Sequence, residues 1–396
     1  FSLFLQFTKM ERIYFDNAAT TPVAPEVVEA MLPYIQYQFG NASSVHHFGK
    51  GVKVILEDTR DLVADFLKCK PKEVFFTSGG TESDNFAIKG PTFHFLNSGK
   101  NHIITTSIEH SALNESVKYL NERFGTEITY IKPERDGSID PQKILAAVTP
   151  KTHLISMMHA NNELGVVNDI KTIADNTDRN EIIFHADTVQ SIGKTAFNTK
   201  DFNVNIACMS GHKIYGPKGI GVMYIKDGTP IDKLIHGGKQ ERNMRGGTEN
   251  IAGVVGLKRA LEILIDRMDE DLRHYKQLKG YFKAKLQEYY PEGIIINGDS
   301  AHTLDNIINI SFDQNYFDVD SETLLINLDL KGTACSSGSA CTSGSPQPSR
   351  ILMELGLDYQ TALCSVRVSF GRDNTTEEVD KFFDIVRGIA KKRSIN

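Results

Sequence analysis

Short apolar runs alternate with longer amphipathic segments over the first half of the chain. Each run is rich in β-branched or aromatic residues and has the length of a strand. We expect strands at residues 73–76, 102–105, 128–131, 153–157, 182–185, 204–209 and 222–225. Helical patterns such as residues 52–66 lie beside or between these strands. The alternation is typical of an α/β fold with a mostly parallel sheet, which binds ligands at the carboxyl ends of its strands.

The pattern changes near residue 250. From Asn250 to about Tyr290 apolar residues recur at helical spacing, which predicts one long helix that bridges two domains. The remainder of the chain mixes strand patterns, at 306–310 and 365–369, with helices, as expected for an α+β domain. The interval from Gly332 to Ser349 is rich in Ser, Gly, Cys and Pro, and we expect a mobile loop there.

Composition narrows the function classes. The 396 residues carry a net charge of −6, so the chain has no signature of nucleic-acid binding, and no apolar stretch approaches the length of a membrane span. Five cysteines, an odd number in a long chain, favour a reducing, cytoplasmic compartment. Residues 1–9 lack the basic leading segment and cleavage site of a signal peptide, and we expect Met10 to be the natural start.

A lysine follows the strand predicted at residues 204–209. It ends the motif Ser210-Gly211-His212-Lys213 and precedes the glycine-rich turn 216–221. An amine held rigidly at a strand end and partly desolvated can lose its proton and form a Schiff base, the chemistry of a pyridoxal phosphate (PLP) enzyme. An isolated lysine is more often a solvated loop residue, so the interpretation depends on the other strand ends.

Two other strand ends offer groups that suit this cofactor. Gly79-Gly80-Thr81 opens a helix, where glycines and a helix N-terminus favour a phosphate; an ordinary threonine cap is the alternative. Asp187 ends the run 182–186 and can keep a pyridinium nitrogen protonated, while Gln190 can reach the phenolic oxygen of the same ring. The alternative is that Asp187 caps the next helix.

Three more polar residues lie at or within predicted strands. His110 can stack on an aromatic cofactor and shuttle protons, or it can be a hydrogen-bonded histidine at a helix start. Asn162 can hold the cofactor or a substrate carboxylate. Arg367 lies inside a strand pattern, where an arginine needs an anionic partner: either a substrate carboxylate or an internal ion pair.

The cysteines differ in their expected exposure. Cys341 lies among small residues on the predicted loop, which makes its thiol available for reaction. Cys69, Cys208 and Cys364 are expected to be buried and inert, and Cys335 lies nearer the strand-like end of the loop. Because no nearby pair completes a zinc set with the two loop cysteines, we expect no metal site.

Taken together, these segments closely resemble the NifS/IscS-type cysteine desulfurases, PLP-dependent enzymes of the class V aminotransferase family with the aspartate aminotransferase fold. The resemblance covers nearly the whole chain. Its motifs are at residues 79–83, 109–110, 161–163, 185–187, 210–213, 245–250 and 337–343. It implies a large PLP-binding domain at residues 22–265, with a mostly parallel seven-stranded sheet. A small α+β domain at residues 1–21 and 266–396 would carry the catalytic cysteine loop, at about 332–349.

The resemblance also implies roles for individual residues. Lys213 would carry PLP and then act as base, Asp187 would pair with the ring nitrogen, Gln190 with the phenolic oxygen, and His110 would stack on the ring. The implied phosphate site consists of Gly80, Thr81, Ser210, His212 and, from a second subunit, Thr248. Asn162 and Arg367 would hold the carboxylate of cysteine. Cys341 would accept the sulfur as a persulfide.

The sequence therefore predicts a homodimeric cysteine desulfurase that converts L-cysteine to L-alanine. It would supply sulfane sulfur to an iron–sulfur scaffold or another acceptor protein, for cluster assembly or thiolation. One rival is a selenocysteine lyase or an aminotransferase of the same fold, although an aminotransferase would not need Cys341. The other rival is a non-catalytic relative, which the joint presence of Lys213, Asp187 and Cys341 disfavours. The chain ends at Asn396, whereas IscS-type members extend further and use that tail to dock a scaffold protein, so the sequence leaves the docking mode open.

Overall fold

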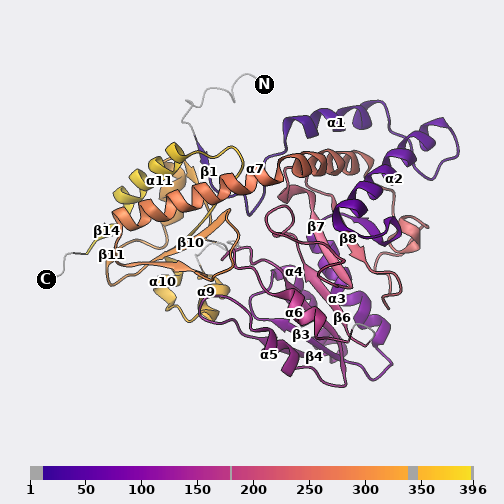
Figure 1. Cartoon of the computed structure of the whole chain (residues 1–396), viewed down its shortest axis with the longest axis horizontal. Helices are drawn as coiled ribbons and strands as arrows, with labels where there is room; N and C mark the ends of the chain where they lie inside the picture. The colour runs from indigo at the N-terminus through magenta and orange to yellow at the C-terminus, as the bar shows by residue number, and fades with distance from the viewer. Residues whose placement is uncertain (1–11, 179–180, 338–346, 394–396) are drawn as a thin grey trace.

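The computed structural model describes residues 12–178, 181–337 and 347–393, arranged in two lobes that the long helix α7 (Ile251–Tyr289) connects (Figure 1). The hydrophobic core of the larger lobe includes Leu264 of α7, and that of the smaller lobe includes Tyr275 of the same helix. α7 therefore passes from one core to the other between Leu264 and Tyr275, close to the domain boundary expected at residues 265–266. The boundary itself stays a prediction. No described helix is long and apolar enough to cross a membrane.

The larger lobe contains the seven-stranded sheet expected from the sequence. Its strands, in spatial order, are β2 (Val74–Thr77), β8 (Gly221–Ile225), β7 (Ile206–Ser210), β6 (Ile183–Asp187), β5 (Thr152–Met158), β3 (His102–Thr106) and β4 (Glu127–Ile131). All neighbouring strands pair in parallel except β8, which is antiparallel to both β2 and β7. This arrangement confirms the predicted mostly parallel α/β fold.

Both faces of this sheet are covered by helices, which explains the uninterrupted apolar runs. Successive strand residues point to opposite faces, so Ile103 packs with one core and Ile104 with the other. Against one face lie α3 (Gly80–Phe95) and α4 (Ser111–Phe124). The helices on the other side are α1 (Pro25–Gln36), α2 (His47–Leu67), α5 (Pro141–Ala146), α6 (Ile170–Asp175) and the first half of α7.

The smaller lobe is built on the antiparallel sheet β13–β10–β9. These strands span Ser365–Ser369, Ile307–Phe312 and Ile294–Asn297, and they pack with α7 and α11 (Thr376–Ile389). The remaining elements are β1 (Ile13–Tyr14) paired in parallel with β12 (Thr333–Ala334), β11 (Phe317–Asp318) paired with β14 (Lys391–Lys392), α8 (Leu324–Leu330), α9 (Arg350–Glu354) and α10 (Tyr359–Leu363).

Two local expectations are wrong. The interval expected to be a loop, residues 332–349, begins with β12, because Thr333 and Ala334 pair with β1; part of it, residues 338–346, lies outside the described residues. Cys69 is only partly buried, since it follows the end of α2 at the surface, whereas Cys208 and Cys364 are buried as expected.

Candidate active site

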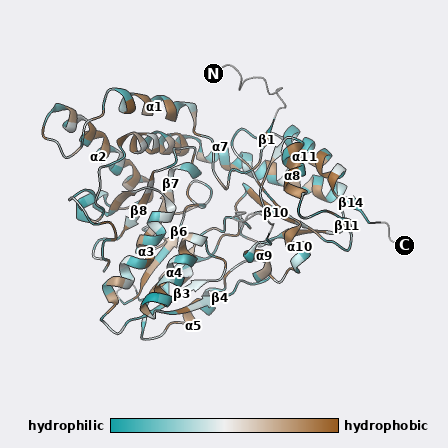
Figure 2. Cartoon of the chain, turned by 180° about the vertical axis from the view of Figure 1, so that it is seen from behind, coloured by the Kyte–Doolittle hydropathy of each residue, from teal (hydrophilic) through white to brown (hydrophobic). Residues whose placement is uncertain are grey.

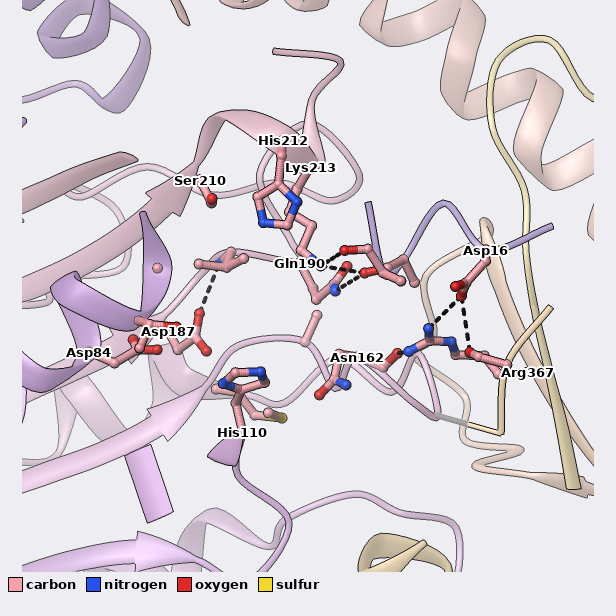
Figure 3. Close-up of a pocket in the computed structure, with 18 residues that line it drawn as sticks. Asp16, Asp84, His110, Asn162, Asp187, Gln190, Ser210, His212, Lys213 and Arg367 are labelled. Atoms are coloured by element: carbon pink, nitrogen blue, oxygen red, sulfur yellow. Dashed lines mark hydrogen bonds and ion pairs between the residues drawn. The ribbon is translucent and has the colours of Figure 1, made fainter. Parts of the chain in front are cut away.

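A cavity of about 500 Å³ lies at the carboxyl ends of β5, β6 and β7, between the two lobes (Figure 3). It brings together ten of the residues predicted from the sequence: Gly80, Thr81, His110, Asn162, Asp187, Gln190, Ser210, His212, Lys213 and Arg367. Thr248 lies outside this cavity, in a smaller exposed hollow that Arg245 and Asn250 also line. Cys341 lies outside the described residues.

Lys213 ends a short 3-10 turn, Gly211–Lys213, that directly follows β7. Its Nζ donates hydrogen bonds to the carbonyl oxygens of Ala18 at 2.5 Å and Ala19 at 2.7 Å. Burial, followed by the positive charges of Lys194 and Arg367, lowers the pKa of Lys213 to about 7. A large share of this amine is therefore unprotonated near neutral pH and can act as a nucleophile.

Asp187 and Gln190 place oxygen atoms on the cavity wall beside this lysine (Figure 3). Asp187 is the last residue of β6, and its Oδ1 accepts a hydrogen bond from the Val189 amide at 2.9 Å, so it does cap the following turn. Burial raises the pKa of Asp187. Gln190 donates to the carbonyl oxygen of Ala18 at 2.9 Å, while its Oε1 is buried without a partner among the described residues. An unpaired buried acceptor of this kind is expected where a bound molecule supplies the missing hydrogen-bond donor.

The N-terminus of α3 forms one end of the cavity. Gly79 has φ 148°, a backbone conformation that glycine adopts and residues with a side chain rarely do. The 16-residue helix that starts at Gly80 has no side-chain N-cap. The first amides of α3 and the hydroxyls of Thr81 and Ser210 therefore make a neutral anion cradle. Burial lowers the pKa of His212 to about 4, so this imidazole contributes as a hydrogen-bonding group rather than as a cation.

His110 precedes α4 and lines the opposite wall of the cavity (Figure 3). Its Nδ1 accepts a hydrogen bond from the Ala112 amide at 3.1 Å, the arrangement of a histidine at a helix start. Desolvation lowers the pKa of His110, and the accepting Nδ1 leaves the proton of the neutral ring on Nε2. The preceding residue, Glu109, is fully buried and accepts from Thr106 Oγ1 at 2.5 Å and from the Met158 amide at 2.8 Å. These bonds anchor Glu109, the residue before the histidine, to the ends of β3 and β5.

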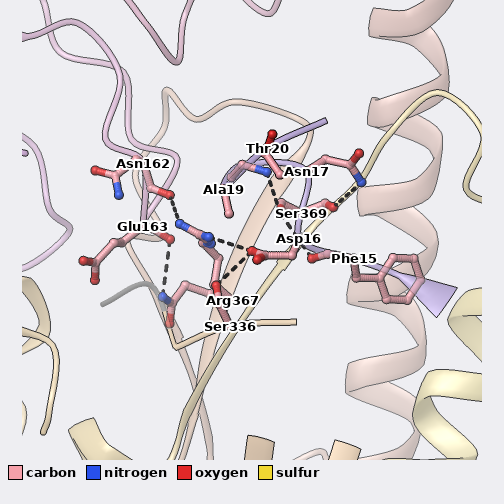
Figure 4. Close-up of polar contacts among 12 residues, drawn as sticks. Phe15, Asp16, Asn17, Ala19, Thr20, Asn162, Glu163, Ser336, Arg367 and Ser369 are labelled. Carbon is pink, nitrogen blue, oxygen red and sulfur yellow. Dashed lines mark hydrogen bonds and ion pairs between the residues drawn. The ribbon is translucent and has the colours of Figure 1, made fainter. Parts of the chain in front are cut away.

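Arg367 reaches the cavity from β13 of the smaller lobe, and its internal ion pair is present (Figure 4). Nη2 is 2.7 Å from Asp16 Oδ1, and Nη1 donates to the carbonyl oxygen of Asn162 at 2.8 Å. The guanidinium Nε and the Asn162 side-chain oxygen are buried without a partner among the described residues. Arg367 is thus paired with Asp16 and still has an N–H group, at Nε, that could donate a hydrogen bond to a ligand.

A buried polar cluster behind Asp187 was not predicted from the sequence. His185 Nε2 lies 3.8 Å from Asp84 Oδ1 and 3.2 Å from Cys208 Sγ. Burial lowers the pKa of His185 to about 3, while burial and the neighbouring Asp187 raise that of Asp84. Burial therefore disfavours the charged form of both side chains. One signal was available: His185 is two residues before Asp187 on one strand, so both side chains lie on the same face of the sheet.

Comparison with known proteins gives a consistent result. The family model "Aminotransferase class-V" matches residues 13–382. The cysteine desulfurase IscS of Dictyoglomus turgidum is 41% identical over 380 residues, which are 96% of this chain and 95% of that protein. The IscS of Methanosarcina thermophila is 42% identical over 97% of this chain and 93% of its own length.

Solved structures with the same fold include two of similar sequence. A NifS-like protein superposes with a TM-score of 0.87 at 35% identity, over 96% of this chain and 99% of its own. SspA, solved in complex with cysteine, superposes with a TM-score of 0.78 at 34% identity, over 90% and 98% of the two chains.

Proposed function

The chain belongs to the aminotransferase class-V family, and from this premise we propose that it is a PLP-dependent cysteine desulfurase that converts L-cysteine to L-alanine. One observation carries the proposal: the amine of Lys213, whose pKa is lowered to about 7, shares a cavity with the carboxylate of Asp187 and the guanidinium of Arg367. The names of the relatives and the cysteine bound to SspA support the choice of substrate.

The donor set of the cavity fits PLP. Lys213 would hold the aldehyde carbon, Asp187 the ring nitrogen and Gln190 the phenolic oxygen, with His110 against the ring face. The phosphate would be held by the first turn of α3 with Gly80, Thr81, Ser210 and His212. The uncapped helix start supports this fit. The unpaired side-chain oxygen of Gln190 is an acceptor and would take a hydrogen bond from the phenolic hydroxyl. When bound, PLP supplies an electron sink for bond cleavage at an amino acid.

The residues of this chain would then bind the substrate and move protons. Arg367 would orient the substrate carboxylate, since its Nε–H is an unpaired donor at the cavity. Asn162 would contact the same carboxylate through its side-chain NH2 group, because its unpaired oxygen is an acceptor. With a pKa of about 7, Lys213 can accept a proton from the substrate and return it near neutral pH. Buried Asp187 would keep the ring nitrogen of bound PLP protonated, because a carboxylate there is most stable beside a positive charge.

We propose that the thiolate of Cys341 attacks the sulfur of the substrate: the new S–S bond forms as the C–S bond breaks, which leaves a persulfide on the enzyme. Ser336 lines the cavity and precedes Cys341 by five residues, a tether of at most about 17 Å. Cys335, the nearest described thiol of this segment, is a poor nucleophile, because burial raises its pKa to about 12.

We also propose a homodimer. Thr248 is exposed in its own subunit, and the neighbouring Arg245 is fixed to Glu82 of α3 by contacts of 2.9 and 3.1 Å, so this turn is held at the surface. A second copy would bring Thr248 to the phosphate of its partner. Large apolar side chains between α1 and α2 are also exposed, among them Tyr37, Phe39 and Val45. The segment that joins the two helices lies at the outer end of the larger lobe, away from the smaller one (Figure 2). The persulfide would pass to an iron–sulfur scaffold or another acceptor protein in the cytoplasm.

One assay separates this function from its rivals. The purified, PLP-loaded protein is incubated with L-cysteine and a reducing thiol, and alanine, sulfide and 2-oxo acids are measured. We expect alanine and sulfide in equal amounts. A 2-oxo acid formed without sulfur release would make the protein an aminotransferase. Turnover of L-selenocysteine with none of L-cysteine would make it a selenocysteine lyase, and the absence of all products would favour a non-catalytic relative.

A further inference from the structure

The carboxylate of Asp16 lies against the arginine of the proposed substrate site (Figure 4). Its Oδ1 is 2.7 Å from Arg367 Nη2 and accepts a hydrogen bond from Ser336 Oγ at 3.0 Å. The arginine side chain is 4% exposed and that of Asp16 is 22% exposed, and both line the cavity. Asp16 therefore presents a negative charge to any molecule that occupies the cavity.

The backbone of Asp16 is held on two sides. It directly follows β1 and Phe15, which pair with β12, and it forms a bridge to Ser369 of β13. Its carbonyl oxygen accepts hydrogen bonds from the amides of Ala19 at 3.0 Å and Thr20 at 3.3 Å. Because Arg367 lies two residues before Ser369 on that same strand, the carboxylate and the guanidinium belong to one hydrogen-bonded unit.

The contacts of Arg367 fix its direction. Asp16 holds Nη2, and the carbonyl oxygen of Asn162 holds Nη1 from the larger lobe, so the planar guanidinium is gripped at both ends. A group held in this way loses little further freedom when it binds a carboxylate. Removal of Asp16 would leave one of these two contacts.

The charged side chains that line the cavity also limit which ligands it can bind. Among the described lining residues, the lysine and arginine side chains are Lys213 and Arg367, and the carboxyl groups are Asp16, Asp84 and Asp187. Asp16 already balances Arg367. A ligand with one carboxylate can share this arginine, whereas a second carboxylate nearby would meet the charge of Asp16 without a further cation among these residues.

We propose that Asp16 is a positioning and selectivity residue: its carboxylate orients Arg367 for the single carboxylate of the substrate and disfavours amino acids whose side chain carries a second one. This inference rests on the proposed function, in which Arg367 receives the substrate carboxylate. It extends that function by naming the substrate class, amino acids with an uncharged side chain.

The test compares two amino acids that differ only by a carboxylate on the side chain. L-alanine and L-aspartate are titrated into the PLP-loaded protein, and their binding is followed by the absorbance change of the bound cofactor. In D16N, which keeps an oxygen acceptor but no charge, we expect alanine affinity within about threefold of wild type and aspartate affinity about tenfold higher. In D16A, which loses the contact itself, we expect both ligands to bind at least about tenfold more weakly.

The matched control is S336A, which removes the hydroxyl beside Asp16 but not the charge, and should leave the aspartate-to-alanine affinity ratio unchanged. The same ratio in D16N as in wild type overturns the selectivity role, and wild-type alanine affinity in D16A overturns the positioning role. Cooperative thermal unfolding shows that each variant is folded. If D16N does not fold by this criterion, D16S replaces it as the uncharged variant. Desulfuration of cysteine, assayed in the same wild-type preparation, tests the proposed function separately, because it does not depend on this ratio.

Discussion

Lys194 directs its side chain at the backbone of Lys213, and its Nζ donates a hydrogen bond to the Lys213 carbonyl oxygen at 3.2 Å. Burial lowers the pKa of Lys194 to about 8, so this second lysine is still mostly protonated at neutral pH. After burial, its charge is the strongest influence that lowers the pKa of Lys213 to about 7. One buried amine thus prepares the other for attack on a carbonyl.

Replacement of this charge should shift the pH dependence of cofactor capture. In Lys194→Met the neutral side chain no longer disfavours the protonated form of Lys213, so the pKa of Lys213 rises. The rate at which apoprotein captures PLP should then reach its plateau at a higher pH than in wild type, because the unprotonated amine is the nucleophile. Lys218→Met, which removes an exposed lysine, is the control and should leave the profile in place.

Borohydride reduction should fix the cofactor on the peptide that contains Lys213. Of the two lysines in this region, Lys213 is the one that lines the cavity, whereas Lys194 donates to its backbone from behind. Peptide mass spectrometry after reduction identifies the labelled residue. Lys213→Ala should lose the label, and Lys194→Met should retain it. A label on Lys194 in the wild-type protein would contradict the assignment.

Asp187 and Asp84 offer a matched pair of buried carboxyl groups. Asp187→Ala should lower turnover by about 100-fold or more even when saturated with PLP, because the ring nitrogen loses the charge that keeps it protonated. Asp84→Asn should retain most activity, since burial and Asp187 raise the pKa of Asp84 and so favour its uncharged form. Near-normal turnover of Asp187→Ala at saturating PLP would reduce its role to the observed cap of Val189.

Strand ends explain why so much of this site was predictable. Asp187 and Ser210 end adjacent strands of the sheet, and the carboxyl ends of parallel strands meet at one edge, so a linear pattern predicts a spatial cluster. Asp16 carries no such signal. It contacts Arg367 across 351 positions of the chain, through a two-residue strand too short to show a pattern. Contacts of this kind depend on how distant segments pack, which periodicity does not encode.

A buried ion pair stabilises the turn that leads to Thr248. Arg60 Nη1 and Nη2 lie 2.8 and 3.0 Å from the carboxylate of Glu241, and the two side chains are 2% and 3% exposed. Glu241→Ala should lower the free energy of unfolding by about 3 kcal/mol, because the buried guanidinium of Arg60 then keeps, among the described residues, only the exposed Glu57, 3.3 Å away, as a charged partner. Urea unfolding measures the difference. Asp227→Ala, which breaks an exposed pair with Lys72, is the control and should cost less than about 1 kcal/mol.

Cys335, which precedes residues 338–346, and Cys341, which lies within them, should differ in reactivity. Cys335 is partly buried next to β12, and burial raises its pKa to about 12, so its thiol is almost entirely protonated at neutral pH. Cys341 has serine, glycine, alanine and threonine as its near neighbours in sequence, none of which adds a negative charge that would oppose the thiolate. An ordinary cysteine has a pKa of about 8.5, and a minority of such a thiol is already reactive at neutral pH.

We therefore expect Cys341→Ser to bind PLP and cysteine, as judged from the cofactor absorbance, yet to form no persulfide and almost no alanine. Cys335→Ser should stay largely active, because a protonated thiol contributes little as a nucleophile. Mass spectrometry after one turnover of the wild-type protein should find one added sulfur atom on the peptide with Cys341. Sulfur on Cys335, or normal alanine production by Cys341→Ser, would show that another thiol accepts the sulfur and would refute the proposed transfer step.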